Sequence, residues 1–264
     1  MSAGIAVDVL IPTCERACAL AVTLTALSAQ TMRRFRIIVS DQSDGPVAFA
    51  GAELAAVQRY LAASGIELIA LRHLPRLGMA EQRAFLLSRS EAPYCLFLDD
   101  DVIVESDLLA RLHCTIREQQ CGMLSYLAEQ RPGQQGIEFW DGGVAPERIF
   151  PDSAQSERHH LHSAANLFHV QQRLGLGRND TRCYKVAWIG GCVLFDSVKL
   201  RAAGGFDFWR QLPAEHCGED VLAQLRVMER FGGCGIIPSA AYHMELPTTI
   251  ITTRVVDVPK VLYP

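Results

Sequence analysis

Three consecutive aspartates, Asp99, Asp100 and Asp101, follow the apolar segment Tyr94–Leu98, which has the composition of a buried strand. Adjacent carboxylates repel one another unless a cation neutralises them. Oxygen ligands of this kind suit Mg²⁺ or Mn²⁺, which also accept phosphate oxygens of a ligand. In an open α/β sheet, ligands bind beyond the carboxyl ends of the strands. The triplet therefore indicates a metal site, with a solvated acidic turn before the next helix as the alternative.

A second acidic pair, Glu219-Asp220, opens a segment whose apolar residues share one helical face (Val221, Leu222, Leu225 and Met228). Carboxylates are favoured at helix N-termini by capping and by the helix dipole, so a structural cap is one interpretation. The dipole also keeps a carboxylate ionised, as a general base requires. The pair is thus a candidate for catalysis or for capping.

His243 lies in Tyr-His-Met-Glu, beyond a strand-like segment, and a neutral imidazole there can ligate Mn²⁺ or serve the structure alone. Asp41 ends the segment FRIIVSD and begins a turn-forming string, where an aspartate commonly bonds its own backbone. Both side chains follow predicted strands, where a ligand would bind.

Arg83 lies five residues after Gly78 on a predicted helix. Its guanidinium could pair with a diphosphate, or with Glu81 or a surface carboxylate. Two tryptophans, Trp188 and Trp209, could face a sugar ring or belong to the core. Three histidines (His159, His160 and His162) could form a metal cluster, although their polar surroundings favour a solvated face.

The first half of the chain alternates strand-like and helix-like segments. We expect strands at 5–11, 35–40, 66–71 and 94–98, and helices at 18–30, 47–64, 78–90 and 106–119. Such alternation implies βαβ units, hence an α/β fold with a Rossmann-like, mostly parallel sheet flanked by helices. In the less regular second half we expect a loop at 130–152, helices at 159–174 and 219–231, two strands within 186–195 and one at 236–243.

The composition is that of a folded protein: 49% of the 264 residues are hydrophobic, and the formal net charge is −4. The acidic balance argues against nucleic-acid binding, which requires a basic face. Nine cysteines without CxxC spacing predict reduced thiols. No signal peptide and no transmembrane segment is expected. These features predict a cytoplasmic protein, and leave open a peripheral place at the inner membrane face.

Several motifs in the first half resemble those of family 2 glycosyltransferases with the GT-A fold. They are a strand ending in Pro-Thr, a second strand ending in an acidic turn, a Gly-x-Ala…Arg helix and an Asp-x-Asp strand end (VDVLIPTCER, FRIIVSDQSDG and GMAEQRAFLLSRSEAPYCLFLDDDVIV). The second half resembles the acceptor half of that family (WIGGCVLFDSVKLRAAGGFD, CGEDVLAQLRVMERFGG and AAYHMEL). The order of the motifs, over roughly residues 5 to 245, carries the resemblance.

The resemblance implies one GT-A domain with a nucleotide-sugar-binding half at 1–122 and an acceptor-binding half at 123–264. Its expected activity moves a hexosyl or acetamidohexosyl group from a nucleoside-diphosphate sugar, with UDP favoured, to an acceptor hydroxyl with inversion. The expected cofactor is Mn²⁺ or Mg²⁺. The acceptor is unknown: a saccharide, a lipid-linked molecule or a small molecule.

The resemblance also implies roles for the residues that match its motifs. Asp101 and His243 would hold the metal, and Asp99 would bond the ribose hydroxyls. Asp100 would either assist or point away. Asp41 would accept from the uracil ring N–H.

By the same resemblance, Thr13 would lie beside the base and Arg83 would meet the donor diphosphate. Asp220 would take the proton of the acceptor hydroxyl, with Glu219 as the alternative base.

Two other functions are compatible with parts of the sequence. A nucleotidyltransferase also combines an α/β sheet with acidic metal sites, but it usually carries a Gly-rich basic loop after the first strand, where this chain has PTCERACAL. A non-catalytic nucleotide-sugar-binding homologue would not need the Glu219-Asp220 pair. Glycosyl transfer is therefore the preferred hypothesis.

Overall fold

The structure, a computed structural model, describes residues 4–45, 48–125, 175–184, 186, 188–244, 246–247 and 255–263. The loop expected at 130–152, the helix expected at 159–174 and the three histidines His159, His160 and His162 lie outside these residues.

One eight-stranded sheet forms the centre of the described chain, in the order β3-β2-β1-β4-β8-β6-β10-β7. Strands β3, β2, β1 and β4 are parallel neighbours, whereas β8 runs antiparallel between β4 and β6. The expected α/β fold with a mainly parallel sheet is confirmed. The strands are β1 (Val7–Thr13), β2 (Phe35–Asp41), β3 (Glu67–Arg72), β4 (Tyr94–Leu98), β6 (Met123–Ser125), β7 (Arg182–Tyr184), β8 (Cys192–Asp196) and β10 (Gly233–Ile237).

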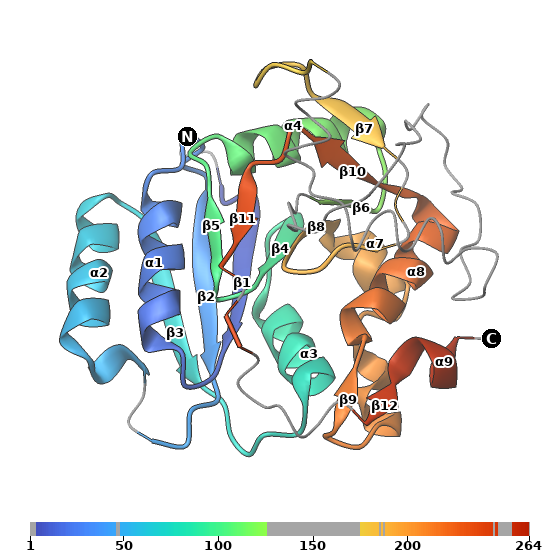
Figure 1. The fold of residues 1–264 in the computed structure, drawn as a ribbon, viewed down its shortest axis with the longest axis horizontal. Coiled ribbons are helices and arrows are strands. Elements are labelled where there is room, and N and C mark those ends of the chain that lie inside the picture. Colours follow the sequence, from blue (N-terminus) through green and yellow to red (C-terminus); the bar gives the residue numbers. More distant parts are fainter. Residues whose placement is uncertain are drawn as a thin grey trace.

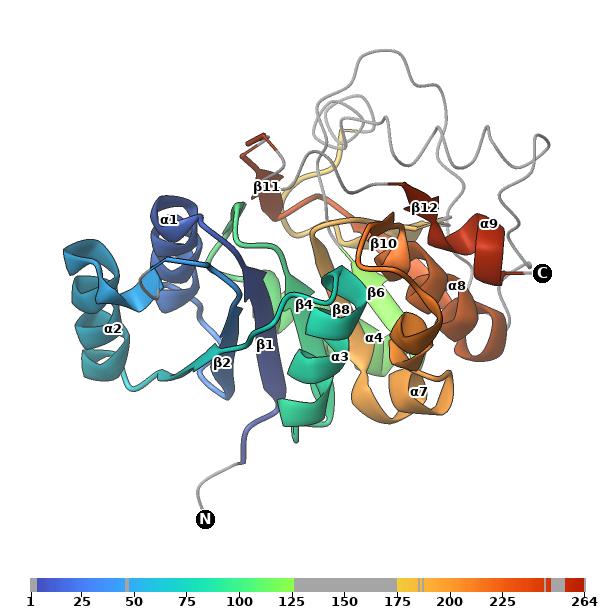
Figure 2. The ribbon, with the colours of Figure 1, turned by 90° about the horizontal axis from the view of Figure 1, so that it is seen from below.

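Helices cover both faces of this sheet (Figures 1 and 2). Side chains alternate along each strand, so Val9 and Ile11 of β1 pack in one core with α1, α2 and α4, whereas Leu10 packs in the other with α3, α7 and α8. The longer helices are α1 (Ala17–Ser28), α2 (Ala52–Ala63), α3 (Met79–Arg89), α4 (Leu108–Gln119) and α8 (Glu219–Phe231). Shorter ones are η1 (Ala48–Ala50), α7 (Ser197–Ala202), η2 (Asp207–Gln211) and α9 (Val258–Leu262).

A two-stranded sheet follows the aspartate triplet directly. Strand β5 (Val102–Val104) pairs antiparallel with β11 (Ala241–His243), and His243 lies opposite Val102. This pairing brings His243 beside the triplet although 142 positions separate it from Asp101 in the sequence. A second pair joins β9 (His216–Cys217), which precedes α8, to β12 (Val256–Asp257), which precedes α9.

Two expectations for the second half were wrong. The segment 236–243 is not one strand: β10 ends at Ile237 and β11 begins at Ala241, because Pro238 has no N–H to continue the ladder. In the segment 186–195 only β8 is a strand, and the residues before Gly191 are irregular where the structure describes them. Glycines with no side chain to pack weaken a strand at that point.

None of the nine cysteines forms a disulfide in the structure. Within the described residues, no helix has the length and apolar character needed to cross a membrane.

Candidate active site

The candidate residues of the first half gather at one edge of the sheet. Thr13 ends β1, Asp41 ends β2, and Asp99 follows β4. Thr13 and Asp41 are register partners. Because parallel strands bring their carboxyl ends to the same edge, these residues share the location where α/β sheets bind ligands.

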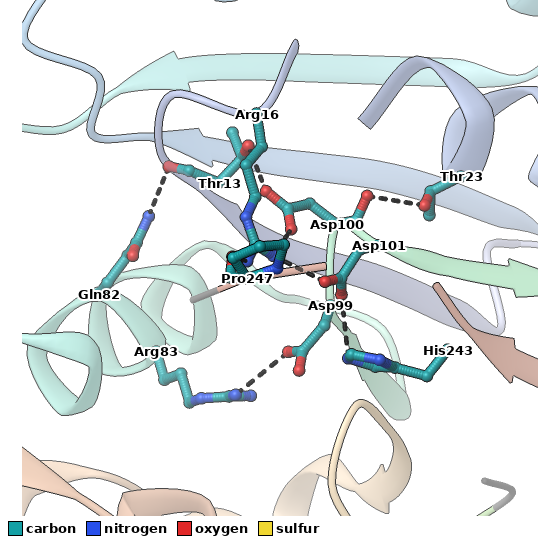
Figure 3. A network of polar contacts seen from close by, with 10 residues as sticks. All are labelled: Thr13, Arg16, Thr23, Gln82, Arg83, Asp99, Asp100, Asp101, His243 and Pro247. Carbon is teal, nitrogen blue, oxygen red and sulfur yellow. Dashed lines mark hydrogen bonds and ion pairs between the residues drawn. The ribbon is translucent and has the colours of Figure 1, made fainter. Parts of the chain in front are cut away.

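Asp100 is buried and fully engaged with its neighbours (Figure 3). The Thr13 hydroxyl donates to its Oδ2 at 2.7 Å, and Arg16 Nη1 lies 3.3 Å from its Oδ1. Its backbone carbonyl accepts from the Thr23 hydroxyl at 2.8 Å, which ties the triplet to α1. Burial raises the pKa of Asp100 to about 6, against the opposing effects of Thr13 and Arg16.

Asp101 lies between two positively charged or polar partners. His243 Nε2 is 3.3 Å from its Oδ1, and Arg16 Nη1 is 2.7 Å from its Oδ2. Burial alone would raise the pKa of Asp101, but the hydrogen bonds and charges of His243 and Arg16 hold it below its ordinary value. The Asp101 carbonyl accepts from the Met244 N–H at 2.8 Å, so β11 is fixed against the triplet. The structure thus brings together the two residues predicted to hold a metal.

Arg16 is a site residue that the sequence analysis missed. It directly precedes α1 and closes the motif VDVLIPTCER, which was the available signal. Its Nη1 contacts both Asp100 and Asp101, and its Nη2 donates to the carbonyl of Pro247. One guanidinium therefore connects the first loop, the triplet and the segment after β11 (Figure 3).

The carboxylate of Asp101 and the imidazole of His243 offer atoms that divalent cations bind. A carboxylate oxygen and an imidazole nitrogen face each other, and Mg²⁺-type sites commonly use one or two carboxylates with substrate phosphates. Within the residues that the structure describes, no three His, Cys, Asp or Glu side chains form a metal-binding group. The residues fit a cation that takes its remaining ligands from a bound nucleotide, provided that Arg16 moves from Asp101.

Arg83 joins the triplet to the acidic pair of α8. Its Nη2 is 3.2 Å from Asp99 Oδ1 and its Nε donates to Glu219 Oε1 at 3.1 Å. Burial lowers the pKa of an arginine, but the charges of Asp99 and Glu219 raise that of Arg83 well above its ordinary value. Glu81, the partner considered in the sequence, instead lies 2.8 Å from His73 Nε2.

Asp220 stands beside Glu219 at the start of α8, after Gly218 in the left-handed region. Its Oδ1 accepts from the Val221 N–H at 2.9 Å. Burial, followed by the negative charge of Glu219, raises the pKa of Asp220 to about 7. A carboxyl group with a pKa near neutrality is well matched to proton transfer.

Asp41 stabilises the turn that follows β2, as its position suggested. Its Oδ1 accepts from the backbone N–H of Ser43 at 2.9 Å and from the Ser43 hydroxyl at 2.6 Å. Gln82 of α3 donates to the carbonyl of Ser40 at 2.8 Å, which fixes the end of β2 against α3. These contacts hold the Asp41 carboxylate at the sheet edge, beside Thr13.

The tryptophans lie with the core. Trp188 and Trp209 are partly buried against the apolar cluster that contains α3, α7 and α8, and the Arg210 guanidinium lies 5.0 Å from the Trp209 ring centroid.

Two further side chains position the site and were not singled out in the sequence. Gln224 is fully buried, and its amide accepts from the N–H of Ile189 at 2.8 Å and donates to the Ile189 carbonyl at 2.7 Å. Gly191 lies two residues after Ile189, and its carbonyl accepts from the Asp99 N–H at 2.8 Å. The other is His216, whose Nε2 accepts from the Ala80 N–H at 3.0 Å at the start of α3.

The fold is shared with known GT-A glycosyltransferases. The crystal structure of residues 1–349 of S. aureus TarS matches with a TM-score of 0.57 and 14% identity, over 90% of this chain and 60% of that one. GalNAc-T7, in complex with UDP, GalNAc and Mn²⁺, matches with a TM-score of 0.61 and 15% identity, over 94% and 46%.

The mannosyltransferase PcManGT from Pyrobaculum calidifontis, in complex with GDP-Man and Mn²⁺, matches with a TM-score of 0.54 and 16% identity, over 89% of this chain and 57% of that one. This chain thus spans 60% or less of the length of these three structures.

Residues 8–126 match the model of glycosyl transferase family 2. No curated protein sequence matches the chain significantly. The GT-A fold expected from the sequence is confirmed, and the match over residues 8–126 confirms the resemblance to family 2. The division at residue 122 stays a prediction, as do the roles of the individual site residues.

Proposed function

We propose that this protein is a glycosyltransferase that moves a sugar from a UDP-linked donor to an acceptor hydroxyl, with inversion and with Mn²⁺ or Mg²⁺ as cofactor. The observation that carries the proposal is the Arg83 bridge. Arg83 contacts both Asp99 of the triplet and Glu219 of the acidic pair, so the two acidic groups belong to one continuous polar site. A donor bound at the triplet then lies next to a carboxyl group suited to activate an acceptor.

In this proposal, Asp41 recognises the base because its carboxylate accepts from the N3–H of uracil, as it could from thymine. Asp99 bonds the ribose, with Thr13 and Asp100 supporting that edge of the sheet. Arg83 stabilises negative charge on the diphosphate. The solved neighbours support a nucleotide sugar as donor, since TarS has been crystallised with UDP-GlcNAc and with UDP, and PcManGT with GDP-Man.

Asp101 and His243 would hold the metal, which supplies positive charge for the leaving diphosphate. Two of the solved neighbours contain Mn²⁺. Asp220 accepts the proton of the acceptor hydroxyl, and a single in-line displacement then inverts the anomeric carbon. Glu219, held by Arg83, keeps its carboxylate in an ion pair.

A panel of nucleotide sugars tests this function. We expect UDP-sugars with Mn²⁺ to raise the melting temperature and to be hydrolysed slowly, and EDTA to abolish both effects. ADP-sugars should bind more weakly, because adenine presents no ring N–H to Asp41. Preferential binding of ADP over UDP, TDP and GDP would contradict the role of Asp41, and an equal thermal shift in EDTA would contradict the role of the metal.

A further inference from the structure

Arg16 places a positive charge on the carboxylate expected to bind metal. Its Nη1 lies 2.7 Å from Asp101 Oδ2 and 3.3 Å from Asp100 Oδ1. The side chain is 18% exposed, so the contact is largely shielded from water. The other Asp101 oxygen faces His243 at 3.3 Å. Both oxygens of Asp101 are thus engaged within the protein itself.

A divalent ion at Asp101 and His243 would lie close to this guanidinium. Like charges a few ångströms apart repel strongly in a shielded site. A second arginine, Arg83, already forms an ion pair with Asp99. The triplet therefore cannot hold Arg16 and a metal ion in the observed arrangement, and Arg16 must leave Asp101 when the ion binds.

The place to which Arg16 can move is set by the fold. It is carried by the loop between β1 and α1, which follows Thr13 on the sheet edge that would hold the donor. A guanidinium presents paired N–H groups that match two phosphate oxygens, and the donor diphosphate brings the negative charge that Arg16 would lose.

We propose that Arg16 serves as an internal cation that neutralises Asp100 and Asp101 before the donor binds. When the metal binds, the Arg16 guanidinium leaves these carboxylates and pairs with the donor diphosphate. Metal and donor then bind cooperatively, since each removes the obstacle to the other. This inference rests on the proposed function, because it takes Asp101 and His243 as the metal ligands.

A purely structural role for Arg16 predicts the opposite behaviour. If Arg16 only orients Asp101, its loss should disorder the carboxylate and weaken metal binding. If Arg16 competes with the metal, its loss should strengthen metal binding in the nucleotide-free protein. The sign of the change in Mn²⁺ affinity therefore separates the two roles.

The experiment measures the Mn²⁺ dissociation constant of the full chain by electron paramagnetic resonance, with and without UDP. In Arg16→Gln we expect tighter Mn²⁺ binding without UDP, weaker UDP binding in the presence of Mn²⁺, and a smaller effect of UDP on Mn²⁺ affinity. These changes should lie within about 5- to 150-fold, the usual range for coupled sites. Arg59→Gln, which removes the same charge from the exposed surface of α2, should behave as wild type.

Arg16→Lys keeps the charge, and serves if Arg16→Gln does not fold. It should bind Mn²⁺ with an affinity nearer to that of wild type. Unchanged or weaker Mn²⁺ binding in Arg16→Gln, or coupling to UDP equal to that of wild type, would overturn the proposal. So would Mn²⁺ binding by Arg16→Lys that is as tight as that of a folded Arg16→Gln.

The two proposals fail in different ways. Sugar transfer that persists fully in EDTA would leave the glycosyl transfer reaction standing and overturn the exchange at Arg16. Mn²⁺ and UDP binding that is coupled through Arg16, without turnover of any nucleotide sugar, would support the exchange and count against the proposed reaction.

Discussion

Arg83 is a single residue that holds carboxylates from distant parts of the sequence. Asp99 contacts Nη2 of its guanidinium and Glu219 contacts Nε, and both Arg83 and Glu219 are buried. Removing one member of a buried ion pair leaves an unpaired charge, which costs more than the pair itself contributes. The stability of the protein should therefore report on this contact independently of any activity.

Replacement of Arg83 by Gln should destabilise the protein by about 3 kcal/mol. Adding Glu219→Gln removes the stranded charge, so the double variant should recover part of the loss. Thermal unfolding of wild type, the two single variants and the double variant gives the coupling free energy between Arg83 and Glu219. A change of 1 kcal/mol corresponds to roughly 2–4 °C of melting temperature. A double variant no more stable than Arg83→Gln alone would show that the bridge does not stabilise the site.

Asp220 makes stability depend on pH in a definite direction. Its pKa is about 7 in the folded protein, against an ordinary value of 3.8, so the native state holds this proton more tightly than the unfolded chain. The resulting stabilisation is complete below pH 4 and is lost as the pH rises to about 7.

Asp220→Asn removes this ionisation, so its melting temperature relative to wild type should be higher at pH 8 than at pH 5. Differential scanning fluorimetry at both values measures the change, with Asp207→Asn at an exposed carboxylate as the control. A difference between variant and wild type that is the same at both pH values would argue against the raised pKa.

At the scale of elements, the start of α3 is held by a histidine from the other half of the chain. His216 accepts from the Ala80 N–H with Nε2, while its Nδ1 lies 2.7 Å from the Pro213 carbonyl. Gly78 precedes the helix with φ of 102°, and a Cβ there would lie 2.4 Å from His216 Cε1. Only glycine fits both the backbone and the space, and α3 carries Arg83 and Gln82 into the site.

Gly78→Ala should therefore destabilise the protein by about 2 kcal/mol or more and weaken UDP binding, because α3 must shift. Gly65→Ala is the matched control: its φ is 72°, but a Cβ there meets nothing within 4 Å. It should show only the backbone cost, about 1–2 kcal/mol, and normal UDP affinity. Chemical denaturation and UDP titration test both variants. Equal UDP affinity in the two would contradict the positioning role of α3.

The elements that sequence could predict are those with strong local signals. Helix α8 begins at Glu219 and ends at Phe231, as expected, because an apolar stripe is followed by Gly232-Gly233. Strands β5 and β11 have three residues each, and their pairing depends on contacts between distant segments. Such pairs leave little pattern in the sequence, which explains why β5 was missed.

The whole molecule combines a predictable half with a less predictable one. The alternation of strands and helices allowed the parallel pairing of β1 to β4 to be predicted. It therefore also predicted that Thr13, Asp41 and Asp99 lie at one edge of the sheet. The insertion of antiparallel β8 between β4 and β6 is a tertiary choice without a local signature.

The same distinction applies to the candidate site. Asp101 and His243 were expected together only through the family resemblance, and the structure brings them to 3.3 Å. The contacts of Arg16 and the Arg83–Glu219 pair could not be predicted, because a long cationic side chain has many possible partners in a sequence with 29 acidic residues. Packing alone selects which carboxylates it meets.

The proposed function requires that one site both binds a nucleotide-sugar donor and activates an acceptor through Asp220. Its most direct test is donor turnover by Asp220→Asn, measured together with UDP affinity and beside Glu219→Gln. Asparagine keeps the size and capping ability of aspartate but accepts no proton, so turnover should fall by roughly 10²- to 10⁴-fold while UDP affinity stays at the wild-type level. Full turnover by Asp220→Asn would contradict the role of Asp220 as the base. If Glu219→Gln alone were inactive, Glu219 would be the base.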